Sequence, residues 1–456
     1  MKTGVIVSVA LALALTTGAS PAGPATAGGR DVVASPDVQL VTLRNGMRLL
    51  LAPDSSATAV DIAVWYRAGT VHERAGITGI SHLFEHMMFR GSAHFGPQEH
   101  SRLIQAEGGT ANAYTTPDYA CYHQTVPAGA LELVFRLEAD RIGSLKLTPE
   151  NLEAEKRIVR EETRWRAELG AGGRTVQRLY ALAYASHPYG WPVTGLEQDL
   201  ERITLADCQA YFDDHYAPNN ATVTVVGAFD AGVALRAAKR WLEPLKRRRV
   251  SAELPPPEPA QTAERRAVAS LDLPVPLLAA GWRVPGRPEP DDAALGLMLR
   301  ILVSGPASRL QRALVTGPPQ CLSVQGAFDS WRAGGLLYFL AAAQPGADSA
   351  AVERALVDEV EKLDREPVSD EELERARRQE DLAVLFGRQT ARGRAESLGS
   401  AFMLDGDWRA ASQRLERLRA LTPADLQRAA ARVLVPAGRD IVWILPTRGA
   451  NAQGGR

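Results

Sequence analysis

The chain has 456 residues, of which 45% are hydrophobic, 23% charged and 6% aromatic. This length exceeds what one hydrophobic core normally organises, so we expect a globular protein of at least two domains. The 52 Lys and Arg residues balance the 53 Asp and Glu residues, for a formal net charge of -1. This balance excludes a global basic field that would draw the chain to nucleic acid or to an anionic membrane.

Residues 1–27 have the pattern of an export signal peptide. Lys2 precedes the apolar run VIVSVALALAL, and small residues follow up to Ala27, near which we expect cleavage. The run is shorter than the roughly 20 apolar residues of a membrane-spanning helix, and no other stretch is long and apolar enough. The mature chain is therefore expected in the periplasm or outside the cell, without a membrane span.

The cysteines give little sign of metal or disulfide chemistry. Cys121, Cys208 and Cys321 have no CxxC spacing, which disfavours a cysteine zinc site and leaves at most one internal disulfide. Buried free thiols are the expected state.

The mature chain alternates short apolar runs with longer amphipathic segments, which predicts a mixed α and β fold. Runs rich in β-branched and aromatic residues predict strands at 60–66, 221–226, 335–341 and 440–445. Helices are expected at 131–142 and 352–363.

The segment GISHLFEHMMFRGS (79–92) places two histidines and a glutamate in an apolar, helix-compatible stretch. Positions i, i+3 and i+4 of a helix lie on one face, so His82, Glu85 and His86 would project together. Two imidazoles so placed can chelate one metal ion, and zinc suits this type of ligand. The alternative, ordinary hydrogen bonding, would need separate partners for three polar groups in one small region.

A second helix is predicted from Pro149, with Thr148 as its N-cap, and it offers candidates for a third ligand. Glu155 and Glu162 are seven residues apart, so they would lie on one face, two turns from each other. One could bind the metal while the other supports a neighbouring group. The alternative is a charged helix surface that faces solvent, since basic residues are interspersed along the segment.

The proline-rich segment 246–265 predicts a linker, because its three consecutive prolines cannot continue a helix or a central strand. The expected domains are therefore 38–245 and 266–446. The two halves look related, because TLADCQ at 204–209 is echoed by TPADLQ at 422–427, and Pro218 by Pro436, at the same offset of 218 residues. The shared offset predicts an internal duplication.

The motif HLFEH (82–86), followed by Glu155 and Glu162, resembles the inverted zinc motif HxxEH of the M16 metallopeptidases, the family of pitrilysin, insulin-degrading enzyme and the mitochondrial processing peptidase. The similarity extends from about Val38 to Pro446. It implies an α+β fold of two homologous domains, each a mainly antiparallel sheet packed with helices. Further blocks similar to the family are GGTANAYTTPDYACY (108–122), HPYGWPVTG (187–195) and YAPNNATVTVVG (216–227).

The resemblance implies a role for each residue of the motif. His82, His86 and Glu162 would bind one zinc ion per chain, Glu85 would be the general base, and Glu155 would support a ligand histidine. Glu85 would take a proton from the attacking water and return it to the leaving amine. The chain would then be a zinc endopeptidase that acts on peptides.

In this family the substrate lies extended along an edge strand of the active half. The resemblance therefore implies that Asn112, Ala113, Tyr114 and Thr115 bind substrate. Strand addition uses main-chain hydrogen bonds and is only loosely sequence-specific. The same residues could equally be only a sheet edge before a turn at Pro117.

The second half departs from the active pattern. When Ser304-Gly305 is aligned with Gly91-Ser92, the residues opposite His82, Glu85 and His86 are apolar, so no zinc site is expected in this half. These residues are Leu295, Met298 and Leu299.

Family members that are active without a partner subunit also carry an Arg and a Tyr in the second half. These two residues stabilise the negative charge that develops on the substrate carbonyl. This chain has Val315 and Leu322 at the matching places, and neither side chain can donate a hydrogen bond. The resemblance thus implies a homologous partner subunit that lacks zinc ligands and supplies the Arg and the Tyr. The alternative is a non-catalytic peptide-binding or structural subunit of an M16-type complex.

Overall fold

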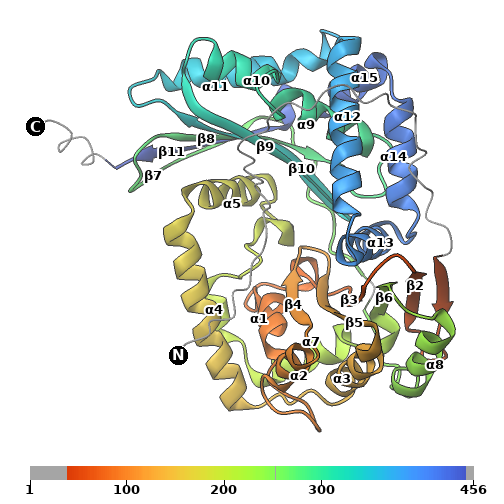
Figure 1. The fold of residues 1–456 in the computed structure, drawn as a ribbon. Coiled ribbons are helices and arrows are strands. Elements are labelled where there is room, and N and C mark those ends of the chain that lie inside the picture. The colour runs from red at the N-terminus through yellow and green to blue at the C-terminus, as the bar shows by residue number, and fades with distance from the viewer. Residues whose placement is uncertain (1–37, 252, 448–456) are drawn as a thin grey trace, which may run out of the picture.

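The computed structural model describes residues 38–251 and 253–447, and the predicted signal peptide at 1–27 lies outside this range. Two open mixed sheets, each packed with helices, form the molecule, which confirms the predicted α+β fold (Figure 1). No helix in the described part of the chain is long and apolar enough to cross a membrane. The three cysteines are buried and free, as expected.

The first half, 38–251, builds a six-stranded sheet. Its strands are β1 (Gln39–Thr42), β2 (Arg48–Pro53), β3 (Ala59–Tyr66), β4 (Thr110–Thr115), β5 (Ala120–Pro127) and β6 (Ala221–Gly227). Its helices are α1 (Ile80–Met87), α2 (Glu99–Ala106), α3 (Leu131–Ser144), α4 (Pro149–Leu169), α5 (Ala171–Ala183), α6 (Glu197–Arg202), α7 (Leu205–His215) and α8 (Ala231–Trp241). The sheet order is β1-β2-β6-β3-β5-β4, and only β2 and β6 are parallel.

The second half, 253–447, builds a five-stranded sheet. Its strands are β7 (Arg265–Leu271), β8 (Leu277–Val284), β9 (Cys321–Trp331), β10 (Gly334–Ala343) and β11 (Arg439–Pro446). Its helices are α9 (Asp292–Val303), α10 (Arg309–Gln311), α11 (Ser349–Glu361), α12 (Asp370–Gly387), α13 (Ala391–Asp405), α14 (Ala410–Ala420) and α15 (Pro423–Val433). The sheet order is β7-β11-β8-β10-β9, and only β7 and β11 are parallel.

The two sheets repeat one pattern, since β2-β6-β3-β5-β4 in the first corresponds to β7-β11-β8-β10-β9 in the second. Thr204 caps α7 and Thr422 caps α15 with the same reciprocal hydrogen bonds, and a strand follows each helix at the offset that the sequence predicts. The four predicted strands lie within β3, β6, β10 and β11. The two predicted helices correspond to α3 and to α11 with the short turn after it.

Each sheet is covered on one face by a helix from the other half (Figure 1). Along β3, Val60, Ile62 and Val64 face the core of the first half. The alternate residues Ala63 and Trp65 face α13 of the second half. Apart from the buried Asp61, strand β3 is therefore apolar on both sides, because both of its faces are buried.

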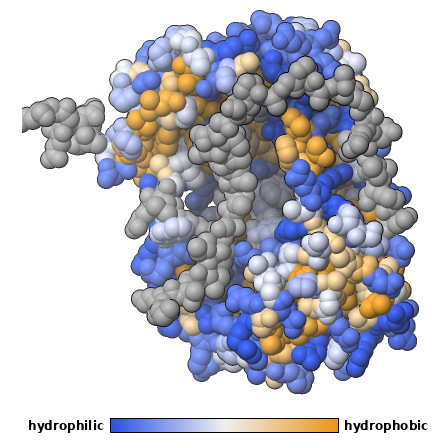
Figure 2. Space-filling view, in the orientation of Figure 1, coloured by the Kyte–Doolittle hydropathy of each residue, from blue (hydrophilic) through white to orange (hydrophobic). Residues whose placement is uncertain are grey.

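The contact of α13 with the first sheet is close. A Cβ added to Gly399 would lie 2.1 Å from the Trp65 ring, so only glycine fits there. In the same way, Leu179 and Ala183 of α5 pack on the second sheet beside Ala279. This exchange of α5 and α13 interlocks the halves, and the surface is hollowed between them (Figure 2).

Candidate metal centre and active site

Helix α1, which carries the two histidines, is anchored at its N-terminus. Its N-cap Gly79 has a left-handed backbone with φ 86°, and an added Cβ would lie 2.5 Å from the carbonyl oxygen of Thr194. The buried Glu73 carboxylate accepts the backbone N–H groups of Gly79 at 2.8 Å and Ser81 at 3.0 Å. Glu73 thus satisfies donors that the first turn of a helix leaves unpaired.

Three metal-type ligands converge where α1 meets α4. The ligand atoms of His82, His86 and Glu162 all lie within 4.8 Å of one another. Glu162 Oε2 lies 3.3 Å from His86 Nε2 and 3.7 Å from His82 Nε2. Ligand atoms around a tetrahedral zinc ion are roughly 3.3 Å apart at normal bond lengths, so the donor set and its spacing fit zinc. No other such group occurs among the residues that the structure describes.

A second carboxylate orients His86 from the far side of the ring. Glu155 Oε2 lies 3.1 Å from His86 Nδ1, and Arg90 donates to the other oxygen of Glu155. Because a carboxylate only accepts, Nδ1 carries the proton and Nε2 is left to face Glu162. Burial lowers the pKa of His86, but hydrogen bonds to Glu155 and Glu162 outweigh it and raise this pKa to about 9. The carboxylates that raise this pKa would equally favour a metal cation at Nε2.

Glu85 lies on the same helix and is almost fully buried. The Thr115 hydroxyl, from the end of β4, donates a hydrogen bond of 2.7 Å to Glu85 Oε2. Sequence reasoning missed this contact, because it depends on the register that pairs Thr115 with Ala120 of β5. No motif spacing indicates that register.

Strand β4 is the edge strand of the first sheet, as the sequence predicts. Ala113 and Thr115 are buried on its inner side, whereas Asn112 and Tyr114 are half-buried on the other side. The Tyr114 hydroxyl donates a hydrogen bond of 2.5 Å to Glu396 of α13. The Tyr114 side chain of this strand is thus held by the second half.

A cavity of about 330 Å³ adjoins Glu85, His86 and the edge strand. It lies between α1, α2, β4 and α4. Its apolar walls include Phe89, Ala111 and Ile158.

The second half has no metal ligands at the positions matching the zinc motif. Leu295 and Met298 are buried in the core of that half, and Leu299 packs against it. Val315 packs against the same core, whereas Leu322, near the start of β9, is 51% exposed.

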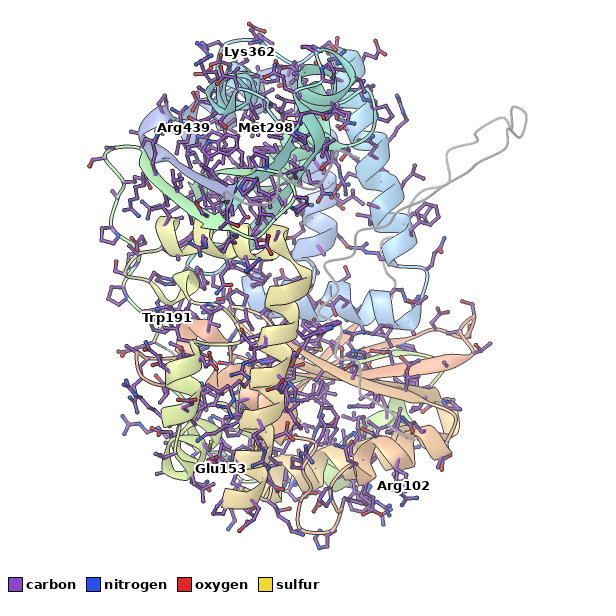
Figure 3. The ribbon with its side chains drawn as sticks, turned by 90° about the vertical axis from the view of Figure 1, so that its left-hand side faces the viewer. Arg102, Glu153, Trp191, Met298, Lys362 and Arg439 are labelled. Atoms are coloured by element: carbon purple, nitrogen blue, oxygen red, sulfur yellow. The ribbon has the colours of Figure 1, made fainter. Side chains whose placement is uncertain are left out.

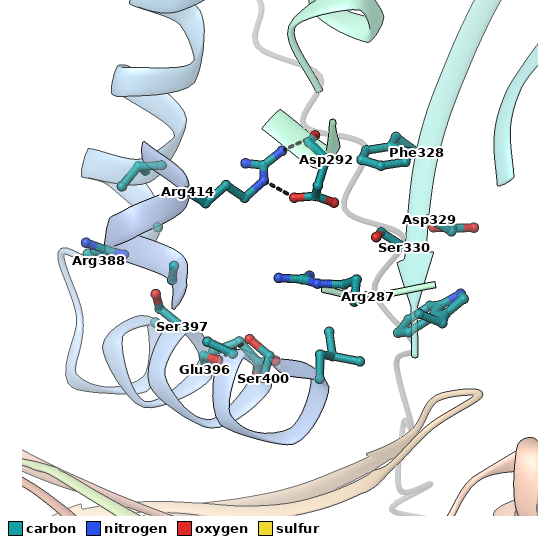
Figure 4. A pocket seen from close by; sticks show the side chains of 17 residues that line it. Arg287, Asp292, Phe328, Asp329, Ser330, Arg388, Glu396, Ser397, Ser400 and Arg414 are labelled. Carbon is teal, nitrogen blue, oxygen red and sulfur yellow. Dashed lines mark hydrogen bonds and ion pairs between the residues drawn. The ribbon is translucent and has the colours of Figure 1, made fainter. Parts of the chain in front are cut away.

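A separate cavity of about 520 Å³ lies in the second half between β9, α12, α13 and α14 (Figure 4). Arg414 pairs with Asp292 on α9, and Arg287 pairs with Asp405. These ion pairs neutralise most of the basic side chains that line the cavity. None of the residues that line it belongs to the metal-type cluster.

Comparison with known proteins agrees with the fold and with the family that the motif resembles. Residues 48–195 match the family profile described as insulinase (peptidase family M16), and residues 202–380 match the profile described as the peptidase M16 inactive domain. The chain is 30% identical over 345 residues to the zinc protease PqqE of Helicobacter pylori, a match that covers 75% of this chain and 78% of that protein.

Two further similarities extend along most of the chain. An uncharacterized zinc protease of Mycobacterium tuberculosis is 26% identical over 395 residues, which covers 86% of this chain and 90% of that protein. The crystal structure of a protease from Helicobacter pylori has a TM-score of 0.85 and 26% identity, and the match covers 90% of this chain and 100% of that one. The chain therefore belongs to the M16 family of zinc metallopeptidases.

Proposed function

We propose that this chain is the zinc-bearing subunit of an exported M16 endopeptidase that hydrolyses peptides or small unfolded polypeptides bound in extended form. The observation that carries the proposal is the convergence of His82, His86 and Glu162, with Glu85 on the same helix. A zinc ion held by these three ligands would polarise both the attacking water and the scissile carbonyl.

Glu85 is the proposed general base. It takes a proton from the attacking water and gives it to the leaving amine, which completes hydrolysis of the peptide bond. Thr115 holds the Glu85 carboxylate by a hydrogen bond to one oxygen. Glu155 keeps His86 in the tautomer that turns Nε2 toward the cluster.

The edge strand β4 is the proposed substrate platform. Asn112, Ala113, Tyr114 and Thr115 would pair through their main chain with an extended peptide, because an edge strand has unpaired N–H and C=O groups. Every peptide has the same main chain, so this pairing supports a broad range of substrates.

A homologous partner subunit, without zinc ligands but with the Arg and Tyr that this chain lacks, would complete the site. Val315 and Leu322 support this part of the proposal, since neither can donate a hydrogen bond to the substrate carbonyl. The pattern of residues 1–27 supports export to the periplasm.

The test is peptide hydrolysis by the purified mature chain, alone and mixed with the nearest homologous chain encoded beside it. We expect turnover in the mixture, and its loss with a chelator or with Glu85→Gln. Equal turnover by the single chain would contradict the need for a partner.

The second candidate is a subunit that binds peptides without cleaving them, and the apolar Val315 and Leu322 favour it. In that case wild type and Glu85→Gln would bind a peptide equally, and neither would turn it over in any mixture.

A further inference from the structure

Strand β4, the proposed substrate platform, is contacted by the second half of the chain. The Tyr114 hydroxyl donates a hydrogen bond of 2.5 Å to Glu396 of α13, and Figure 4 shows Glu396 on that helix above strands of the first half. The second half has no metal ligands at the positions matching the zinc motif, and Met298, which matches Glu85, lies within its core (Figure 3). A half without this motif is thus connected to the strand beside the proposed base.

The Tyr114 side chain is enclosed as well as hydrogen-bonded. Its ring makes edge contacts with the rings of Trp65 and Tyr119, at centroid distances of 6.4 Å and 6.2 Å. Arg392 of α13 lies over the same ring, 5.9 Å from its centroid, and pairs with Glu396 at 2.7 Å. Because a packed and hydrogen-bonded side chain has few alternative positions, the place of α13 determines that of the Tyr114 ring.

Helix α13 is fixed on the first sheet by contacts other than that with Tyr114. Arg392 lies 3.7 Å from the buried Asp61 of β3, and Arg394 pairs at 2.8 Å with Asp54, which follows β2. The contact at Gly399 leaves no space for a closer approach of the helix. The helix therefore offers a fixed point to which an edge strand can be attached.

Neighbouring residues of a strand point to opposite faces of the sheet, so Tyr114 and Thr115 meet different partners. Tyr114 meets α13 on one face, and Thr115 donates a hydrogen bond of 2.7 Å to Glu85 of α1 on the other. Strand β4 is the last strand of its sheet and pairs with β5 along one side. Main-chain bonds on one side fix the register of an edge strand, but its tilt out of the sheet depends more on side-chain contacts. Tyr114 supplies such a contact.

We propose that Tyr114 and Glu396 are positioning residues, and that the hydrogen bond between them holds β4 where the Thr115 hydroxyl reaches Glu85. The inference rests on the proposed function, and it gives the half without zinc ligands a part in orienting the general base of its own chain. The effect of the two side chains on hydrolysis passes through Thr115, not through contact with the reacting atoms.

The first test measures amide hydrogen exchange in the purified mature chain by mass spectrometry, and it needs no peptidase activity. We expect Tyr114→Phe to raise exchange in the segment 110–115 by about threefold or more, because one face of the strand is then held less firmly. Tyr180→Phe is the matched control. The Tyr180 hydroxyl of α5 also donates across the halves, to Asp329 of β9 at the same distance of 2.5 Å. Neither of these residues lies on β4, so exchange at 110–115 should not change.

A second pair of variants separates the hydrogen bond from the packing of the tyrosine ring. Glu396→Gln keeps an oxygen that can accept the hydroxyl proton, so its exchange at 110–115 should stay near that of the wild type. Glu396→Leu removes the acceptor and should match Tyr114→Phe. Unchanged exchange in Tyr114→Phe, or equal increases in Tyr114→Phe and Tyr180→Phe, would overturn the inference.

The second test asks whether the link acts through Thr115. In the mixture with the partner chain, Tyr114→Phe should lower kcat by about fivefold or more in the wild-type background and by less than about twofold in Thr115→Val, because contacts that act in series are not additive. Tyr180→Phe should leave kcat unchanged in both backgrounds. A loss that is equal in both backgrounds would overturn the role of the link. Absence of hydrolysis in every mixture would instead refute the peptidase proposal, and the exchange result would then decide the link by itself.

Discussion

At the scale of single residues, Thr115 links the proposed base to the strand on which substrate would lie. Its hydroxyl donates to Glu85 while its main chain belongs to β4. A hydrogen bond to a charged group is worth about 1.5–3 kcal/mol. We therefore predict that Thr115→Val lowers kcat by roughly tenfold to a hundredfold with little change in KM.

Thr115→Ser is the matched control for this prediction, because it keeps the hydroxyl and should restore most of kcat. Steady-state kinetics with one peptide substrate provides the measurement. Equal kcat values for the Val and Ser variants would show that the hydrogen bond to Glu85 does not matter.

Glu155 would act on the proposed metal centre through its hydrogen bond to His86. Loss of such a supporting carboxylate typically weakens metal affinity by about tenfold to a hundredfold. We predict that Glu155→Gln weakens zinc binding by this amount, measured by competition with a chromophoric chelator. Glu153→Gln, on the same helix but with a side chain that is 60% exposed, should leave zinc affinity unchanged, and a similar loss in both variants would contradict the role of Glu155.

The sequence predicts part of the site because one helix face determines it. The i and i+4 spacing brings His82 and His86 together wherever the helix forms. The convergence of Glu162 depends on how α4 crosses α1, and the Thr115 contact depends on strand register. Both features follow from packing over long sequence separations, so Glu162 could be named only through the family resemblance, and the Thr115 contact could not be predicted.

At the scale of elements, the start of α1 is held by its close approach to the loop at Thr194. Gly79 and Gly76 both have positive φ, 86° and 91°, but an added Cβ clashes with backbone only at Gly79. We predict that Gly76→Ala costs about 1 kcal/mol of stability, the usual cost of a left-handed residue with a side chain, and leaves zinc binding intact.

Gly79→Ala should cost more stability and also weaken zinc binding, because the helix must shift and His82 lies on its first turn. Thermal unfolding and zinc competition on both variants provide the measurement. Identical effects of the two substitutions would show that the approach of the loop does not position α1.

Strands and helices with a strong local pattern could be predicted from the sequence, as β3, β6, β10 and α3 illustrate. The reason that β3 is largely apolar on both faces could not, since Trp65 packs on α13 from the other half. A run of apolar residues indicates burial but not which element covers it.

At the scale of the whole molecule, the exchange of α5 and α13 places charged groups in the contact between the halves. Asp61 of β3 is fully buried there, accepts a hydrogen bond of 2.8 Å from Thr125, and lies 3.7 Å from Arg392. Burial raises the pKa of Asp61 to about 6, although Arg392 opposes this shift.

Because the folded-state pKa of Asp61 lies above its ordinary value of 3.8, the folded protein favours the protonated carboxyl. Its contribution to stability is therefore complete below that ordinary value and is lost as pH rises through about 6. We predict that the free energy of unfolding of the wild type falls relative to Asp61→Asn between pH 4 and 7, measured by urea unfolding. A difference that stays constant or grows with pH would contradict the shift.

The central claim is that the cluster and Glu85 together hydrolyse peptide bonds. The most direct measurement is the hydrolysis rate of an internally quenched, unstructured peptide by wild type and Glu85→Gln, both loaded with one zinc ion per chain and mixed with the homologous partner chain. We predict hydrolysis by the wild type at a rate at least about a hundredfold above that of Glu85→Gln. Equal rates for the two proteins, or no hydrolysis by the zinc-loaded wild type, would contradict the claim.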